Sequence, residues 1–301
     1  MLCAHDARAM VATLVANRSS RIPLIYRCHD IGEDLQPWHS VQGYLERYAA
    51  RAGLKSRLVV QYSEGRAEHF RKLARNSYPN LLVTLNFPSL MLQPERHRLD
   101  DLIVRRFEQR SVTYPGIIKD FVAIDDLVRA IALLPKSWSL SMFGESDGDS
   151  LSGALRLGAE IGLGHRLSHG GWVPPAQVLN ITNSATIGAV LFKPVSINYT
   201  SMATASNKLW EFAARGIPVI VPDTPDFRNA LGSESWIAFF KIGDPRTLAA
   251  GVERLTRSFE AYRAAALRAY EVVRSRYNFE EIFPPVLNSL IAAARSNPVC
   301  Q

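Results

Sequence analysis

The sequence alternates short apolar runs with longer stretches of helical periodicity, and this alternation limits the fold more than any other feature. Apolar runs too short for helices, separated by helical patterns, predict βα units that build a parallel sheet with helices on both faces. No internal repeat of short period and no low-complexity tract interrupts the pattern. Because 301 residues can form two cores of ordinary size, we expect an α/β protein with two Rossmann-like, doubly wound domains.

A highly charged stretch from residue 93 to 110 separates two such patterns. We place the domain boundary there. Residues 1–110 form the first domain, residues 111–260 form a complete doubly wound unit, and residues 261–301 form C-terminal helices, which Pro284 and Pro285 interrupt. The strands of the first domain are expected near residues 2–4, 23–26, 58–60 and 81–83.

The first domain is short of strands. It yields only about three clear ones, whereas a Rossmann-like sheet has two βαβαβ halves with the first strand at the centre. Met1 stands where roughly the fourth strand of such a sheet would begin. We therefore expect this domain to be truncated at its front and unstable alone, so that a partner chain or a dimer contact would complete it, while residues 111–260 fold independently.

Composition and charge limit the classes of partner. The net charge of +7 suits nucleic acid, an anionic membrane surface or a phosphorylated ligand equally well. Scattered arginines and the lack of nucleic-acid motifs argue against nucleic acid. Three cysteines far apart form neither a disulfide framework nor a metal cluster, and the N-terminus lacks a signal-peptide pattern. We expect a cytoplasmic protein, associated peripherally with the inner face of the membrane.

The segment from residue 206 to 220 carries the most chemical information. Ser206 or Asn207 would cap a helix, and the free N–H groups at its start, beside Lys208, would bind a diphosphate. Lys208 and Glu211 are three residues apart and so share one face of the first turn. The alternative from these residues alone is that Glu211 forms an ordinary surface ion pair with Arg215.

This segment resembles the donor-binding helix of the group-1, family-4-like GT-B glycosyltransferases. The resemblance extends from about residue 112 to 255 through several turns in the family's order. These turns are Tyr114-Pro115-Gly116, Met142-Phe143-Gly144-Glu145, the base-pocket turn His169 to Pro174, and Gly243-Asp244-Pro245. Each turn alone is weak, but the ordered set is fairly specific.

The resemblance implies an enzyme that transfers a sugar from a UDP- or GDP-linked donor, with retention of configuration and without a metal. Glu211 would accept hydrogen bonds from the ribose hydroxyls, and the turn from Gly171 to Val173 would hold the base. The amides at Ser206 and Asn207 would bind the diphosphate. The acceptor would be a sugar or a lipid-linked sugar of bacterial polysaccharide or glycolipid biosynthesis.

The sequence departs from the family pattern at two positions. The first Glu of the family's paired glutamates falls at Ala203, which leaves the choice of sugar open. The basic residue expected before the first helix of the second domain aligns near Val122. Lys119 and Lys193 are the nearest substitutes, or else they are solvated surface lysines.

In the first domain, His29 and Asp30 follow an apolar run and resemble the family's interdomain "HD". The imidazole would shuttle a proton or bind a phosphate; the alternative is a structural histidine bonded to Asp30. Two alternatives to a glycosyltransferase remain open. A nucleotide-sugar epimerase or hydrolase would use the same fold, and an inactive or partial chain would need a partner.

Overall fold

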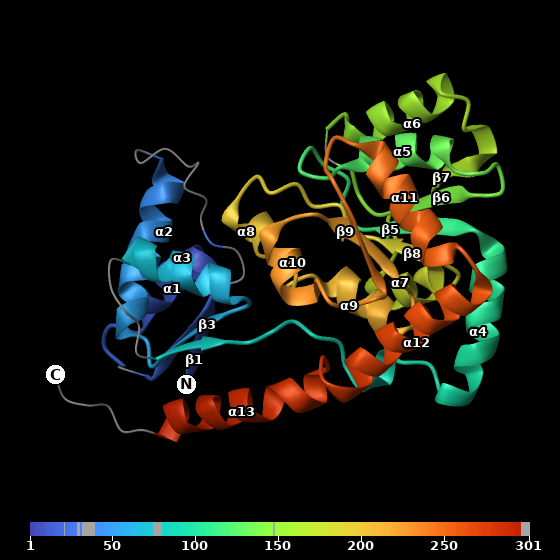
Figure 1. Cartoon of the computed structure of the whole chain (residues 1–301). Coiled ribbons are helices and arrows are strands. Elements are labelled where there is room, and N and C mark those ends of the chain that lie inside the picture. The colour runs from blue at the N-terminus through green and yellow to red at the C-terminus, as the bar shows by residue number, and fades with distance from the viewer. Residues whose placement is uncertain (21, 29–30, 32–39, 75–79, 147, 296–301) are drawn as a thin grey trace. The chain divides into compact units, whose positions relative to one another are not determined.

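The computed structural model describes the chain except for residues 21, 29–30, 32–39, 75–79, 147 and 296–301. The chain divides into two compact units (Figure 1). Unit 1 comprises Met1–Asn86, Val195–Ala205 and Glu280–Gln301, and unit 2 comprises Phe87–Pro194 and Ser206–Phe279. Both are built from parallel βα units, which confirms the expected α/β class with Rossmann-like sheets.

Unit 1 contains a four-stranded parallel sheet in which each strand pairs with the next one in sequence. Its strands are β1 (Leu2–His5), β2 (Leu24–Arg27), β3 (Leu58–Gln61) and β4 (Leu81–Val83). Its helices are α1 (Asp6–Ala16), α2 (Val41–Ala52), α3 (Glu64–Ala74), the short α8 (Ile197–Thr200) and most of α13 (Phe279–Arg295), with a 3-10 turn η1 (Gly53–Lys55) after α2.

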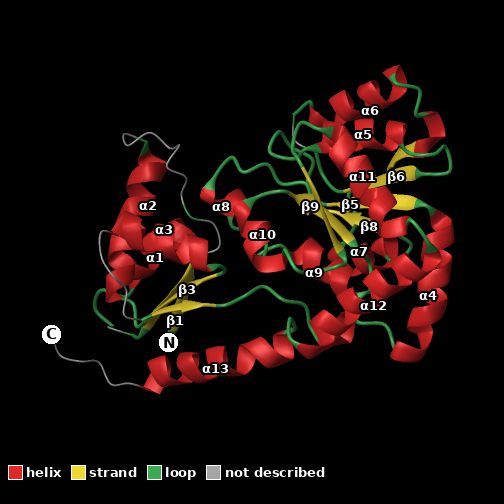
Figure 2. Cartoon of the chain, viewed as in Figure 1, coloured by secondary structure: helices red, strands yellow, loops and turns green. Residues whose placement is uncertain are grey.

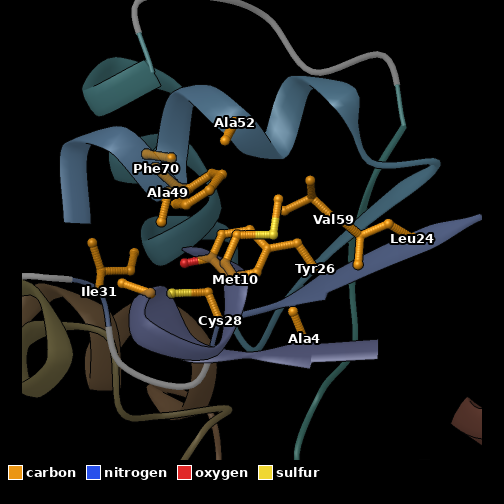
Figure 3. Packing of buried hydrophobic residues seen from close by; sticks show 12 residues of the cluster. Ala4, Met10, Leu24, Tyr26, Cys28, Ile31, Ala49, Ala52, Val59 and Phe70 are labelled. Atoms are coloured by element: carbon orange, nitrogen blue, oxygen red, sulfur yellow. The ribbon is translucent and has the colours of Figure 1, made fainter. Parts of the chain in front are cut away.

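The core of unit 1 follows from the alternation of side chains along its strands. Tyr26 and Val59 lie on the face that packs against Met10 of α1 and Phe70 of α3 (Figure 3). Buried residues on the opposite face of the sheet pack instead against the C-terminal helix α13. They are Ile25, Leu58 and Val60, and their partners on α13 are Leu290 and Ala293. Both faces of this sheet are therefore covered.

Unit 2 contains a six-stranded parallel sheet in the order β10-β9-β8-β5-β6-β7. Its strands are β5 (Ser111–Pro115), β6 (Ser139–Phe143), β7 (Leu167–His169), β8 (Ile187–Ala189), β9 (Val219–Pro222) and β10 (Ile237–Phe240). The chain starts at the central strand β5, proceeds outward through β6 and β7, and then returns to β8 on the other side of β5. This is the doubly wound order, and the strand order reverses between β5 and β8.

Helices form a layer on each face of the unit 2 sheet (Figure 2). The main helices are α4 (Arg96–Gln109), α5 (Ile124–Leu133), α6 (Ser150–Glu160), α7 (Pro175–Thr182), α9 (Asn207–Ala214), α10 (Pro225–Leu231), α11 (Pro245–Thr256) and α12 (Phe259–Ser275); 3-10 turns are η2 (Leu90–Leu92) and η3 (Gly164–Arg166). Contacts group α5 with α6 and α11, and group α12 with α4 and α9. Among the described residues, no helix is both long and apolar enough to cross a bilayer.

The charged stretch that we expected to separate the domains is a helix of unit 2. Leu99 and Ile103 of α4 are fully buried, so the charges belong to the outer face of an amphipathic helix. Unit 2 begins earlier, at Phe87, whose ring makes edge contacts with Trp210 and Tyr277. Helix α13 continues through Pro284 and Pro285, so the interruption expected there is wrong, although each proline removes one backbone donor from inside the helix.

A buried arginine joins the ends of two helices in unit 2. Arg106 of α4 is 1% exposed, and its guanidinium donates to the carbonyl of Asn183 (2.7 Å), the carbonyl of Arg215 (2.6 Å) and Oδ1 of Asn183 (2.6 Å). Asn183 and Arg215 are the C-terminal caps of α7 and α9, where backbone carbonyls lack intrahelical donors. Burial lowers the pKa of Arg106 to about 10, so it stays charged and satisfies both helix ends.

Candidate functional site

The reversal of strand order between β5 and β8 marks the expected ligand position in unit 2. In doubly wound sheets, ligands bind outside the carboxyl ends of the strands at this switch point. Tyr114 is near the end of β5, and Phe192 follows β8. The side chain of Lys208, from the first turn of α9, lies over both rings. The structure therefore brings a cation to the place where the topology predicts a ligand.

The Lys208 ammonium is held in an aromatic setting. Its Nζ lies 4.3 Å from the centre of the Tyr114 ring and 4.8 Å from that of Phe192, and it donates to the Tyr114 hydroxyl at 3.3 Å. Burial lowers the pKa of Lys208 to about 7, although the nearby Glu211 carboxylate opposes this shift. A half-buried lysine whose pKa is lowered to about 7 gains its full positive charge when an anion binds beside it.

A row of glycines lines the strand ends next to this lysine. Gly116, Gly144 and Gly171 have φ values of 132°, 128° and 73°, which L side chains rarely adopt. The Gly116 amide donates to the carbonyl of Phe143, and the Gly144 amide donates to the carbonyl of Gly171, both at 2.8 Å. A Cβ on Gly116 would lie 2.6 Å from the Lys208 Nζ. The missing side chain at Gly116 therefore leaves the space that the Lys208 ammonium occupies, whereas no atom lies within 4 Å of the position that a Cβ would take on Gly171.

The start of α9 supplies the remaining polar groups. Ser206 is buried, and its hydroxyl caps the helix by accepting from the Leu209 amide at 3.4 Å. Burial raises the pKa of Glu211, and the charges of Arg215 and Lys208 counteract that rise. Arg215 donates to Asn183 Oδ1 at 3.0 Å, away from the helix start. Glu211 therefore acts on Lys208 and Arg215 through charge, and its oxygens are placed on the same helical turn as Lys208.

The two substitute lysines lie in the loops after β5 and β8. Lys193 donates from Nζ to the carbonyl of Asp120 at 2.6 Å, and its amide donates to the carbonyl of Phe121 at 2.8 Å. The backbone carbonyl of Lys119 accepts from the Val122 amide at 2.9 Å, and the residue is half-buried. Lys193 therefore ties the two loops together, and its ammonium is directed to a protein carbonyl.

The remaining predicted site residues lie in several places, and two of them are outside the described part of the chain. His29 and Asp30 lie outside the described residues. Val173 is half-buried in the turn before α7, close in sequence to Gly171. Asn207 is the exposed first residue of α9. Ala203, at the position of the family's first glutamate, is fully buried and belongs to unit 1.

Sequence reasoning missed the two aromatic rings that hold Lys208. Tyr114 lies in β5 and Phe192 follows β8, and aromatic residues in and beside buried strands are expected in the core. The available signal was topological. Both side chains are near the carboxyl ends of the two strands that flank the reversal of strand order. Within the described part of the chain, no cluster of acidic, cysteine or histidine side chains is arranged to hold a metal ion.

Solved structures share this architecture. HepE of Anabaena, in complex with UDP and glucose, is 17% identical over 96% of this chain and 77% of its own, with a TM-score of 0.77. Sucrose-phosphate synthase from Thermosynechococcus elongatus is 18% identical over 97% of this chain and 74% of its own, with a TM-score of 0.71. At such low identities the likeness establishes the fold, which is that of the GT-B glycosyltransferases.

The sequence itself assigns the family. Residues 126–287, more than half of the chain, match the family described as glycosyl transferase-like. The chain belongs to this family, which agrees with the resemblance found in its motifs. No curated protein sequence matches the chain closely enough to provide a relative.

Proposed function

We propose that this protein transfers a sugar from a nucleoside diphosphate sugar and binds that donor at the switch point of unit 2. The observation that carries the proposal is the Lys208 ammonium between the Tyr114 and Phe192 rings, beside the bare backbone of Gly116. A diphosphate would add a directly bonded anion to an ammonium whose hydrogen bond in the described structure goes to the neutral Tyr114 hydroxyl. HepE was solved with UDP and with UDP-glucose, which supports a uridine donor for a chain of this fold.

Each proposed residue has a distinct role in donor binding. Lys208 and the N-terminal end of α9, capped by Ser206 and started by Asn207, neutralise the diphosphate. Glu211 accepts hydrogen bonds from the ribose hydroxyls. The base lies on the turn from Gly171 to Val173, and the missing side chain at Gly116 makes room for the Lys208 ammonium that faces the phosphates. Lys119 and Lys193 act from the loops after β5 and β8, where Lys193 also fixes the loop geometry.

The chemistry proposed for this site is electrostatic. Negative charge grows on the leaving nucleoside diphosphate as the sugar departs, so a positive group fixed at that point stabilises the transition state more than the ground state. Lys208 and the α9 terminus supply that charge, and we propose that the reaction needs no metal. Activity that survives a chelator would support this assignment, and activity restored only by a divalent cation would contradict it.

The finer assignments concern the sugar, stereochemistry and acceptor. We propose transfer of a hexosyl group with retention of configuration, because the segment from 206 to 220 resembles the donor helix of retaining enzymes. His29 and Asp30 would act on the acceptor side. We further propose a cytoplasmic enzyme at the inner membrane face, where the net charge of +7 favours anionic lipids carrying a lipid-linked acceptor for polysaccharide or glycolipid synthesis.

Replacing Glu211 with alanine is expected to weaken UDP binding by about 1–3 kcal/mol, the cost of removing a charged hydrogen-bond partner. Isothermal titration calorimetry with UDP and GDP measures this loss. Glu253→Ala, an exposed position on α11, is the matched control and should bind like the parent protein. If Glu211→Ala also binds like the parent, the ribose role is wrong.

Donor affinity is expected to fall as the pH rises through about 7. The pKa of Lys208 is about 7 in the free protein, and a bound diphosphate favours the ammonium form, so binding takes up a proton near neutral pH. UDP-glucose is the suitable probe because its diphosphate ester does not titrate there. We expect an affinity loss of roughly tenfold per pH unit at most, and calorimetry in buffers of different ionisation enthalpy reports the proton directly. A pH-independent affinity would contradict a direct contact.

A further inference from the structure

Helix α2 of unit 1 exposes one continuous stripe of aromatic, apolar and basic side chains. Val41, Tyr44 and Tyr48 are 77%, 65% and 46% exposed, and Arg51 and Lys55 are also exposed. These five residues, called the α2 stripe below, recur at intervals of three and four along α2 and η1. That spacing places them on one side of a helix.

The residues of the α2 stripe are not among the buried residues of the unit 1 core as far as the structure describes it. The opposite side of α2 carries Ala49 and Ala50, which are buried in the cluster with Met10; Ala52 borders the stripe and is buried in the same cluster. Contacts join α2 to α1 and α3 on that inner side. The Tyr44 and Tyr48 rings stack on each other, with centroids 6.4 Å apart and planes 16° apart. Large aromatic surface is thus left in water on a helix that is already packed, which usually marks an interaction surface.

The composition of the stripe selects the partner. Residues 41–57 contain Arg47, Arg51, Lys55 and Arg57 against the single acid Glu46, and the stripe itself contains no acid. Tyrosine rings place an apolar body and a polar tip at a membrane interface. Arginine and lysine keep their heads at the phosphates while their stems lie along the acyl boundary. An apolar protein partner would not account for the basic end of the stripe.

We infer that the α2 stripe docks unit 1 on an anionic lipid bilayer, with the two tyrosines at the interface and the basic residues on lipid phosphates. This docking assigns a specific surface to the proposed membrane association. It rests on the proposed function only in that the function supplies a reason for docking, which is access to a lipid-linked acceptor. The docking itself involves unit 1 alone. It can therefore be tested without donor or turnover.

Co-sedimentation of the full chain with vesicles tests this docking. The parent protein is expected to bind vesicles of phosphatidylcholine and phosphatidylglycerol, and to bind pure phosphatidylcholine at least tenfold more weakly, because each basic residue near an anionic surface adds attraction. Arg51→Glu with Lys55→Glu, and separately Tyr44→Ser with Tyr48→Ser, should each reduce binding to the mixed vesicles at least tenfold. All four positions are exposed, so the variants should fold.

Matched controls separate this surface from general charge. Lys241→Glu with Arg246→Glu makes the same charge change on exposed residues of unit 2, and Leu133→Ser removes an exposed apolar side chain there. Both controls should bind vesicles like the parent. Equal losses in controls and stripe variants, or equal binding to neutral vesicles, would overturn the inference. A tyrosine variant that abolishes a dimer seen by light scattering, with vesicle binding unchanged, would overturn it in favour of self-association.

The same variants keep this result distinct from the proposed function. UDP affinity should be unchanged in the stripe variants, because their substitutions lie in unit 1 and the donor residues lie in unit 2. If the parent binds vesicles through the stripe but binds no nucleotide, the donor assignment fails and the docking surface stands. If nucleotide binds normally and the stripe variants still bind vesicles like the parent, the docking surface alone fails.

Discussion

Lys208→Met is expected to weaken UDP binding about 10- to 100-fold while leaving the protein at least as stable as its parent. The binding loss follows from removing a charged hydrogen-bond donor to a diphosphate, worth about 1.5–3 kcal/mol. The methionine side chain retains apolar contact with the Tyr114 and Phe192 rings, and its sulfur suits aromatic neighbours. A residue that lowers stability when unliganded is more readily explained by ligand binding than by packing.

The stability effect has a defined pH dependence. The pKa of Lys208 is lowered from 10.5 to about 7 in the folded protein, so the folded state binds fewer protons than the unfolded state between those values. The lysine therefore destabilises the protein most below about pH 7, and this effect disappears as the pH approaches the unfolded pKa. We expect Lys208→Met to raise the free energy of unfolding by roughly 1–2 kcal/mol near pH 6, because the half-buried ammonium keeps some hydration.

Calorimetry with UDP and urea unfolding at several pH values measure the two effects. Lys136→Met changes an exposed lysine in the same unit and should alter neither. A variant that loses stability together with binding would mean that the Lys208 ammonium supports the fold. A variant that keeps full UDP affinity would place the diphosphate elsewhere.

Arg106→Met is expected to cost about 3–5 kcal/mol of stability, because it leaves buried carbonyl groups without donors. The guanidinium bonds to the terminal carbonyls of α7 and α9 and to the Asn183 side chain. Methionine fills part of the volume but donates nothing. A loss of this size approaches the net stability of a domain, so unit 2 should unfold at a much lower urea concentration than in the parent protein.

Tryptophan fluorescence follows this unfolding selectively. Of the five tryptophans, Trp138, Trp172, Trp210 and Trp236 belong to unit 2, and Trp38 lies outside the described residues. Arg105→Met, an exposed neighbour on α4, is the control and should shift the midpoint only slightly. An equally small shift for Arg106→Met would mean that water or other donors satisfy the helix ends in solution.

The two units of the structure differ from the expected division of the chain. A locally high density of charged residues does not show which side chains of that stretch the fold buries. The stretch from 93 to 110 was expected to contain the domain boundary, yet most of it forms α4, with Leu99 and Ile103 in the core. Residues 195–205 lie within the sequence of the second domain, yet they belong to unit 1. Asn198 accounts for this, because its amide pairs with both backbone groups of Ile31, at 3.0 and 2.9 Å. Side-chain pairing over such a sequence distance leaves no local signal.

The sequence by itself determined the parallel α/β class, the capped helix at Asn207 and the glycine turns, because these depend on local periodicity, capping and backbone conformation. Only the tertiary structure decided the surroundings of those residues. The Tyr114 and Phe192 rings meet Lys208 because the strand order reverses between β5 and β8, and strand order is a long-range property. The lowered pKa of Lys208 follows from that meeting, since desolvation depends on neighbours far away in the chain.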